Sequence, residues 1–157
     1  RCKTSIGSWN RWNFVLTCDR YSGASMSYPY LPIEDSVSAP FWQATRNRNF
    51  LLQYCPGCEH FQFYPRALCI KCGEEKLEWR SSTGEGIIDS WTEVCRPPAE
   101  GFLAPYTIVR VRLNEGPIVL SRLVESSEVS CDQPVWLAWE ELSDGRALPV
   151  FTTKRGN

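Results

Sequence analysis

The sequence contains a single histidine, His60, among its 157 residues. Histidine is the side chain whose charge changes most readily near neutral pH, and it is the usual base in Ser–His and Cys–His catalytic pairs. The chain also lacks the G-x-S-x-G, P-loop, H-E-x-x-H and G-x-G-x-x-G motifs. We therefore expect that the chain by itself is not an enzyme.

Long apolar runs are missing as well. No segment approaches the roughly 20 apolar residues that a membrane-spanning helix needs, and residues 1–9 lack the apolar stretch of a secretory signal. The C-terminal half also has no excess of basic residues. Residues 81–157 hold seven Lys or Arg against eleven Asp or Glu. Because phosphate neutralisation supplies most of the affinity of nucleic-acid binders, this charge balance disfavours a nucleic-acid partner.

Cysteine, by contrast, is frequent, and four of the eight lie in two C-x-x-C pairs. Each such turn aims two sulfurs at one point, so two turns supply four ligands at about 2.3 Å from a tetrahedral ion. We expect one structural Zn²⁺, held by Cys55, Cys58, Cys69 and Cys72. An iron ion of the rubredoxin type would use the same ligands, and two disulfides are a weaker alternative. Metal thiolates suit a reducing compartment, which makes the cytoplasm the expected location.

The predicted metal site has no catalytic character, because four thiolates leave no open position for water or substrate. Gly73 follows the second pair and gives the turn its backbone freedom, whereas Glu59 occupies the matching position after the first pair. We expect His60 to be a solvated turn residue and not a ligand. Cys95 and Cys131 have no neighbouring cysteine, so we expect two small buried thiols.

Met26 is the only methionine, and the residues before it show no clear periodicity. We interpret residues 1–25 as an upstream extension outside the working protein, with an ordinary N-terminal arm as the alternative. Residues 26–54 then form an arm and a helix. Ser38 is the predicted helix cap, Pro40 fits the first turn, and the apolar spacing places Phe41 and Trp42 on one face together with Thr45.

From residue 84 onward the pattern changes to short strands separated by turn residues. The strands expected here span residues 87–94, 106–113, 118–124, 134–139 and 148–152, after an earlier strand at 50–54. Five strands without a long helix favour a small closed barrel of the OB-fold type over a seven-stranded sandwich. The predicted fold is therefore mainly β: an N-terminal helix, a rubredoxin-like zinc ribbon over residues 55–80, and a five-stranded OB-fold barrel over 81–157.

The order of these motifs resembles one known family. Pro-Phe-Trp leads into Leu-Leu-Gln-Tyr-Cys-x-x-Cys, and Tyr-Pro-Arg-x-x-Cys-x-x-Cys-Gly follows. The next parts are Gly-Glu-Gly-Ile-Ile-Asp-Ser-Trp-Thr, the stretch from Tyr106 to Pro117 and the closing Leu-Pro-Val-Phe. From about Pro32 to Lys154 the chain resembles the DUF35 family, a zinc ribbon joined to an acyl-CoA-associated OB-fold. It departs from the family pattern at residues 47–49 and at Glu59.

The resemblance implies a non-catalytic accessory subunit that assembles with an acyl-CoA-processing enzyme. Partners of this family are thiolase-like enzymes, aldolases of the lipid-transfer thiolase type, or hot-dog-fold hydratases. The partner supplies the nucleophile, and the ribbon and barrel help to form the site that CoA or acyl-CoA enters. The resemblance specifies neither the acyl chain nor the stoichiometry.

Several residues are candidates for this role. Arg66 and Lys71 lie on the predicted ribbon, close to Tyr64 in sequence, and are candidate donors to the phosphates of CoA; Arg46 and Arg48 precede the ribbon and could join them. Phe102 is an apolar residue in a Pro-rich loop and is a candidate partner contact. Two other functions remain open at this point. One is single-stranded nucleic-acid binding by the OB-fold, and the other is electron transfer by an iron ion in the cysteine site.

Overall fold

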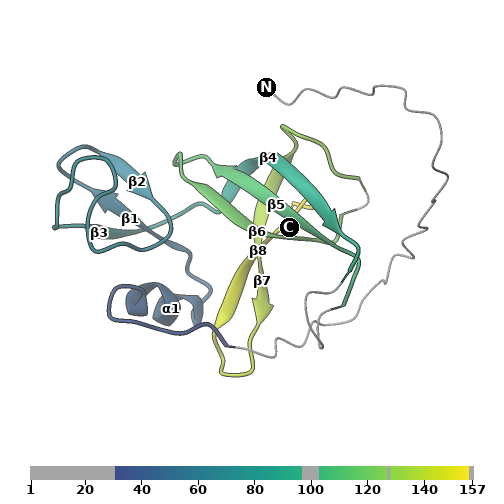
Figure 1. Ribbon diagram of the computed structural model, residues 1–157, viewed down its shortest axis with the longest axis horizontal. Coiled ribbons are helices and arrows are strands. Elements are labelled where there is room, and N and C mark those ends of the chain that lie inside the picture. The colour runs from purple at the N-terminus through teal and green to yellow at the C-terminus, as the bar shows by residue number, and fades with distance from the viewer. Residues whose placement is uncertain (1–30, 97–102, 127, 156–157) are drawn as a thin grey trace.

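The computed structural model describes residues 31–96, 103–126 and 128–155, and it shows a small sheet beside a closed barrel (Figure 1). Its elements in chain order are α1 (Ala39–Thr45), β1 (Leu51–Cys55), β2 (His60–Gln62), β3 (Glu78–Ser81), β4 (Glu85–Val94), β5 (Tyr106–Leu113), β6 (Ile118–Val124), β7 (Pro134–Glu141) and β8 (Ala147–Thr152). Within those ranges no helix is long and apolar enough to cross a membrane.

Helix α1 starts where it was predicted, but Ser38 does not cap it. The carboxylate of Asp35 instead accepts hydrogen bonds from the backbone N–H groups of Val37 and Ser38 and from the Ser38 hydroxyl. The backbone N–H of Asp35 in turn donates a hydrogen bond to the Ser38 hydroxyl oxygen. That oxygen was the predicted acceptor for the first N–H groups of the helix. The predicted apolar face is confirmed, because Phe41 and Thr45 are buried on it.

Strands β2, β1 and β3 form an antiparallel three-stranded sheet with β1 in the centre. The prediction of a strand running into the first cysteine pair is confirmed, since β1 ends at Cys55. Strands β2 and β3 were not predicted. They are three and four residues long, and β3 is mostly exposed, so neither carries an apolar alternation that sequence reasoning could use.

The five remaining strands close into a barrel in the order β4-β5-β6-β8-β7. All neighbours are antiparallel except β6 and β8, which pair in parallel at two positions. The centre of the barrel is filled by inward side chains that are almost fully buried: Ile88, Val109, Val111, Val119, Val135 and Phe151. The predicted mainly β fold, with one short helix, a ribbon and a five-stranded barrel, is confirmed.

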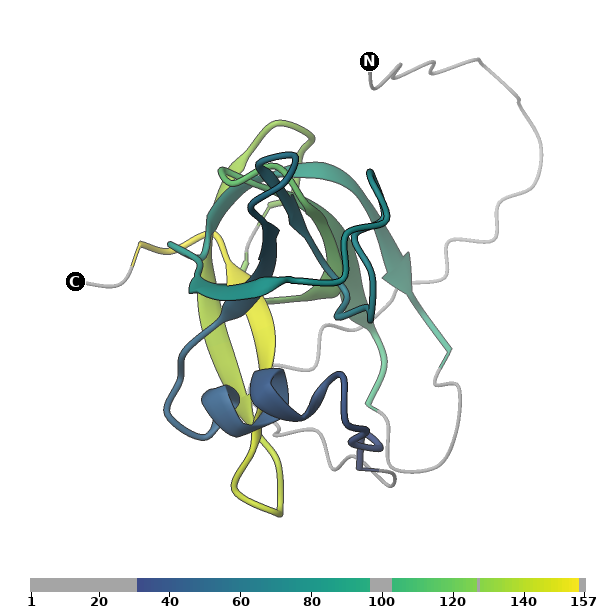
Figure 2. The same ribbon diagram turned by 90° about the vertical axis from the view of Figure 1, so that its left-hand side faces the viewer.

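Helix α1 lies beneath the small sheet and against the end of the barrel, as both views show (Figures 1 and 2). On the sheet side, the ring of Phe41 packs edge-on against Phe50 and Phe63, with centroids 6.1 and 5.5 Å apart. On the barrel side, the hydroxyl of Thr45 accepts a 3.4 Å hydrogen bond from the N–H of Ala147. The helix therefore joins the two sheets through a shared apolar core.

The connection between β3 and β4 is fixed by a residue from a distant turn. Glu115, in the hairpin between β5 and β6, accepts hydrogen bonds from the Ser82 hydroxyl and from the N–H and hydroxyl of Thr83. Gly84 follows with φ +71°, and a Cβ at this position would lie 2.5 Å from the Cβ of Leu137. Only glycine fits this approach, so the direction in which the chain enters the barrel is set by local geometry.

Candidate metal centre and the loop beside it

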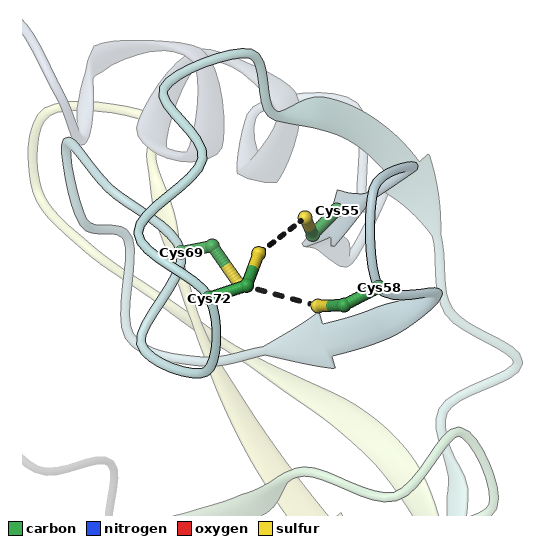
Figure 3. Close-up of side chains that lie close together, drawn as sticks. All are labelled: Cys55, Cys58, Cys69 and Cys72. Carbon is green, nitrogen blue, oxygen red and sulfur yellow. Dashed lines mark hydrogen bonds between the residues drawn. The ribbon is translucent and has the colours of Figure 1, made fainter.

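The sulfur atoms of Cys55, Cys58, Cys69 and Cys72 converge at the end of the small sheet (Figure 3). All four lie within 4.8 Å of one another, and the Cys55–Cys72 and Cys58–Cys69 pairs are 3.5 and 3.6 Å apart. A tetrahedral ion with bonds of about 2.3 Å separates its ligands by about 3.8 Å. The cluster therefore fits a tetrahedral metal ion, and the four thiols are not joined as disulfides.

The two cysteine turns have matching backbone shapes. After the second pair, Gly73 has φ +79°, and the N–H of Lys71 donates to the sulfur of Cys69 at 3.4 Å. After the first pair, Glu59 occupies the same left-handed region with φ +54°. The sequence departure at Glu59 thus leaves the turn unchanged, but it places a side chain with a Cβ where glycine is preferred.

The electrostatics of the cluster favour a cation. Burial raises the pKa of the Cys58 thiol, and hydrogen bonds with the neighbouring cysteines add to the effect. Burial opposes ionisation of Cys69 too, but hydrogen bonds from the N–H groups of Cys72 and Lys71 outweigh it and lower the pKa of Cys69. Without an ion, burial and the neighbouring cysteines therefore favour the protonated thiol at Cys58, whereas a bound divalent metal would stabilise thiolate ligands.

The chemistry of this centre is structural. Four thiolates fill a tetrahedral shell and leave no position for a substrate. Zn²⁺ and iron both accept this donor set, so the geometry assigns a structural metal ion without choosing between the two.

Beneath the second cysteine turn lie two buried amides that sequence reasoning missed. Gln53 and Gln62 are 4% and 2% exposed. Gln53 accepts a hydrogen bond from the N–H of Arg66 (2.8 Å) and donates one to its carbonyl oxygen (2.9 Å). Gln62 donates to the carbonyl oxygen of Leu68 (3.2 Å) and accepts from the N–H of Ile70 (2.9 Å). The available signal was a glutamine inside two apolar strands, Leu-Leu-Gln-Tyr and Phe-Gln-Phe.

We call residues 64–71 the ribbon loop. Its members Arg66 and Lys71 are exposed, so both remain candidates for binding an anion. The two arginines before the ribbon are engaged within the molecule instead. Arg46 donates to the carbonyl oxygen of Asp144 at 2.7 Å, and Arg48 pairs with Glu141.

The other candidate residues are scattered. His60 begins β2 opposite Cys55 and so lies in a strand instead of the expected turn, and it is not a member of the sulfur cluster. Cys95 is exposed and Cys131 is half-buried, so the expectation of two buried thiols was wrong; Cys95 directly follows the last residue of β4, and Cys131 lies in a turn. Phe102, the candidate partner contact, lies outside the described residues.

Comparison with known families gives two matches. Residues 42–78 match "ChsH2, rubredoxin-like zinc ribbon domain", and residues 79–140 match "ChsH2, C-terminal OB-fold domain". The two matches adjoin within the β3 strand and together cover well over half of the chain.

Two curated relatives are similar in sequence. One, from Thermomonospora curvata, is named "Probable enoyl-CoA hydratase alpha subunit" and is 30% identical over 114 residues, 71% of this chain and 36% of the relative. The other, from Pyrococcus furiosus, is named "DUF35 domain-containing scaffold protein" and is 33% identical over 101 residues, 62% of this chain and 65% of the relative. The matches thus span about a third of the first relative and just under two thirds of the second.

Two solved structures are similar in fold. A chain of the "Ltp2-ChsH2(DUF35) aldolase" superposes with a TM-score of 0.71 and 27% identity, over 78% of this chain and 98% of that one. A DUF35 protein of unknown function from Sulfolobus solfataricus superposes with a TM-score of 0.53 over 65% of this chain and 77% of that one; at 19% identity it supports the fold alone. The family matches, the relatives and the four-cysteine ribbon joined to a five-stranded barrel establish that this chain belongs to the DUF35 family.

Proposed function

We propose that the protein is a non-catalytic accessory subunit of an acyl-CoA-processing enzyme. Its metal-stabilised ribbon and its barrel serve as a scaffold that holds the enzyme and contributes to the mouth of the CoA site. The partner is a thiolase-like enzyme, an aldolase of the lipid-transfer type or a hot-dog-fold hydratase, and that enzyme carries the catalytic groups.

The observation that carries this proposal is the similarity to the DUF35 chain of an aldolase. That chain is covered almost completely, over 98% of its length, so the whole of its ribbon and barrel has a counterpart here. The name of the Thermomonospora curvata relative refers to an enoyl-CoA hydratase, which also acts on an acyl-CoA. One histidine and a closed four-thiolate centre agree with a supporting role.

Arg66 and Lys71 are the residues that we assign to the CoA phosphates. Both side chains are exposed on the ribbon loop, and the backbone of Arg66 is held in place by Gln53. Arginine binds phosphate through a planar fork and lysine as a point charge. A cation whose backbone is already fixed loses less freedom when it binds an anion.

The test begins with purification of the full chain from its native source and identification of the enzyme that co-elutes. Recombinant chain and enzyme are then assayed separately and together with acyl-CoA substrates. The proposal expects no turnover by the chain alone and a more active or more soluble enzyme in the mixture. Turnover by the isolated chain, or the repeated absence of an acyl-CoA enzyme among co-eluting proteins, would overturn it.

The nucleic-acid alternative receives little support from the barrel face. Arg110 and Arg112 point outward from β5, but both lie beside Asp89, at 3.4 and 2.6 Å. Two guanidinium groups that share one carboxylate keep a single net positive charge, which offers little to phosphates. Measurement of oligonucleotide binding at two salt concentrations separates this alternative from the scaffold function. An iron-based electron carrier would reveal itself by visible absorbance of the purified protein.

A further inference from the structure

Exposed apolar side chains are concentrated on the ribbon loop, with one more on the barrel strand that Tyr64 of this loop contacts. Of the eight large apolar side chains that are exposed in the described ranges, four belong to this region and are between 47% and 65% exposed: Tyr64, Leu68, Ile70 and Leu120. The first three lie on the ribbon loop, and the fourth points outward from β6. The Tyr64 hydroxyl donates to the carbonyl oxygen of Leu120 at 3.5 Å, which connects the loop to the barrel strand.

We propose that these four side chains, which we call the apolar patch, are the surface on which the acyl-CoA enzyme docks. Exposed apolar groups that gather across two structural units mark interaction sites more often than solitary exposed residues do. The inference rests on the function proposed above and adds the face of the molecule through which that function is performed.

The backbone of the ribbon loop is held in place by side chains of the small sheet. The buried amides of Gln53 and Gln62 fix the backbone at Arg66, Leu68 and Ile70 through the hydrogen bonds described above. At the start of the loop, the ring of Phe63 packs edge-on against Phe50, with centroids 5.4 Å apart.

Burial of two amides costs free energy that their hydrogen bonds must offset, and here those bonds hold a loop that exposes leucine and isoleucine to water. Rigid presentation of apolar side chains is useful for binding, because it lowers the entropy lost when a complex forms. The arrangement is therefore typical of a preformed docking surface.

Charge identifies the kind of occupant. Arg66 and Lys71 flank the apolar side chains of the ribbon loop, so the occupant should be apolar with anionic groups beside it. A second copy docking through the same patch would place these cations against each other. Residues 1–30 carry four Lys or Arg against one Asp, a net charge of +3, and would be repelled as well. An enzyme surface beside a bound CoA, with its phosphates, is complementary in both respects.

The experiment uses the full chain and the recombinant acyl-CoA enzyme that co-purifies with it, and measures Kd by calorimetry. Leu68→Asp and Ile70→Asp should each weaken binding at least about tenfold, because a charge then enters an apolar contact. Leu120→Asp tests the same patch from the barrel, in a different sheet from the cysteines. Ile33→Asp is the matched control, since this isoleucine is 93% exposed on the arm and lies outside the patch; its affinity should stay within about twofold. Metal content and Tm check the fold of each variant.

Each result decides the question. If all three patch variants bind like the parent, the docking face is wrong and the scaffold function stands. If Ile33→Asp weakens binding as much as they do, the effect is one of general charge and the patch is again wrong. If a patch variant instead dissociates a homodimer, or removal of residues 1–30 increases affinity tenfold, the patch has a different occupant. If no acyl-CoA enzyme co-purifies, the proposed function fails together with the inference.

Discussion

Gln53 and Gln62 face each other across β1 and β2, and the amide nitrogen of Gln62 donates a 2.9 Å hydrogen bond to the amide oxygen of Gln53. Each amide also bonds to the backbone of the ribbon loop, so the pair forms a closed network under the second cysteine turn. Buried polar groups stabilise a fold only when all of them are satisfied. The network therefore links the small sheet to the loop that holds the candidate metal ligand Cys69.

The first prediction is that Gln53→Leu destabilises the protein by about 1–3 kcal/mol, because the Arg66 backbone and the Gln62 amide lose their partner in a buried setting. Chemical denaturation followed by fluorescence measures the change. Gln43→Leu on the exposed face of α1 is the matched control and should shift the free energy of unfolding by no more than about 0.5 kcal/mol. Equal effects of the two substitutions would show that the Gln53 network contributes nothing.

The second prediction concerns the metal. Cys69→Ser should abolish stoichiometric metal binding and destabilise the ribbon by several kcal/mol, on the order of a lost structural zinc ligand. Strands β1–β3 are only three to five residues long and share their apolar core with α1 and the barrel, so within the described ranges the sheet has no separate core to hold it without the ion. Elemental analysis measures the ion, and hydrogen exchange should show lost protection over residues 51–81 before the barrel opens. Cys95→Ser, at an exposed cysteine outside the cluster, is the control. A variant that melts like the parent, in protein that contains no metal, would mean that the site is vestigial.

The third prediction follows from the backbone at Glu59. A non-glycine residue in the left-handed region is strained by about 1–2 kcal/mol, whereas glycine adds flexibility to the unfolded chain. Glu59→Gly should therefore leave stability unchanged or raise it by up to about 1 kcal/mol. Gly73→Ala, at the matching position with φ +79°, should lower it. Thermal unfolding of both variants with metal bound checks the pair, and a large loss in Glu59→Gly would show that the side chain has a role of its own.

The fold of this chain could be predicted from sequence to the extent that its residues repeat a regular signal. The cysteine pairs specify the ribbon, and alternation in stretches such as Tyr106–Leu113 gives strands whose bounds agree with the structure. Turn residues between β5 and β6 and between β7 and β8 completed the barrel. These are local signals, which a single sequence carries in full.

The remaining features depend on contacts between distant residues. Ser38 has the composition of a helix cap, yet Asp35 binds its hydroxyl and removes it from that role. Gln53 and Gln62 are nine residues apart and become a pair only when β1 and β2 align. Arg46 and Arg48 resemble Arg66 in sequence, but Arg46 is engaged by Asp144 in the turn between β7 and β8, and Arg48 by Glu141 at the end of β7. Sequence patterns report which face of a strand is apolar and not which partner it meets.

The fourth prediction is that the free energy of unfolding depends on pH through Asp144. The Nε of the buried Arg146 lies 2.6 Å from a carboxylate oxygen of Asp144. Burial works against ionisation of Asp144, but hydrogen bonds from the backbone and side chain of Arg146 outweigh it, and the pKa of Asp144 is lowered. A carboxyl group with a depressed pKa in the folded state stabilises the fold above its unfolded pKa of about 3.9, and this contribution disappears as the pH falls through the folded value.

Asp144→Asn should consequently flatten the loss of stability below about pH 4, relative to the parent protein. Urea unfolding at a series of pH values measures the slope, and NMR titration of the Asp144 carboxyl group gives its pKa directly. Glu75→Gln, an exposed carboxylate on the ribbon, is the control and should leave the slope unchanged. A pKa for Asp144 at or above the unfolded value would contradict the prediction.

The fifth prediction separates the two roles assigned to the ribbon loop. In the complex with its enzyme, the double variant Arg66→Ala and Lys71→Ala should raise KM for the acyl-CoA substrate and leave kcat and the Kd of assembly unchanged. Truncation removes charge-assisted contacts to phosphates that are made equally in the ground state and the transition state, which is uniform binding. Leu68→Asp should show the opposite pattern, with weaker assembly and, once the complex is saturated, the parent KM.

A substrate analogue without the nucleotide phosphates sharpens the test, because the parent and the double variant should then have the same KM. If the double variant weakens assembly instead, the two cations belong to the docking surface, and the CoA phosphates must be bound by the enzyme.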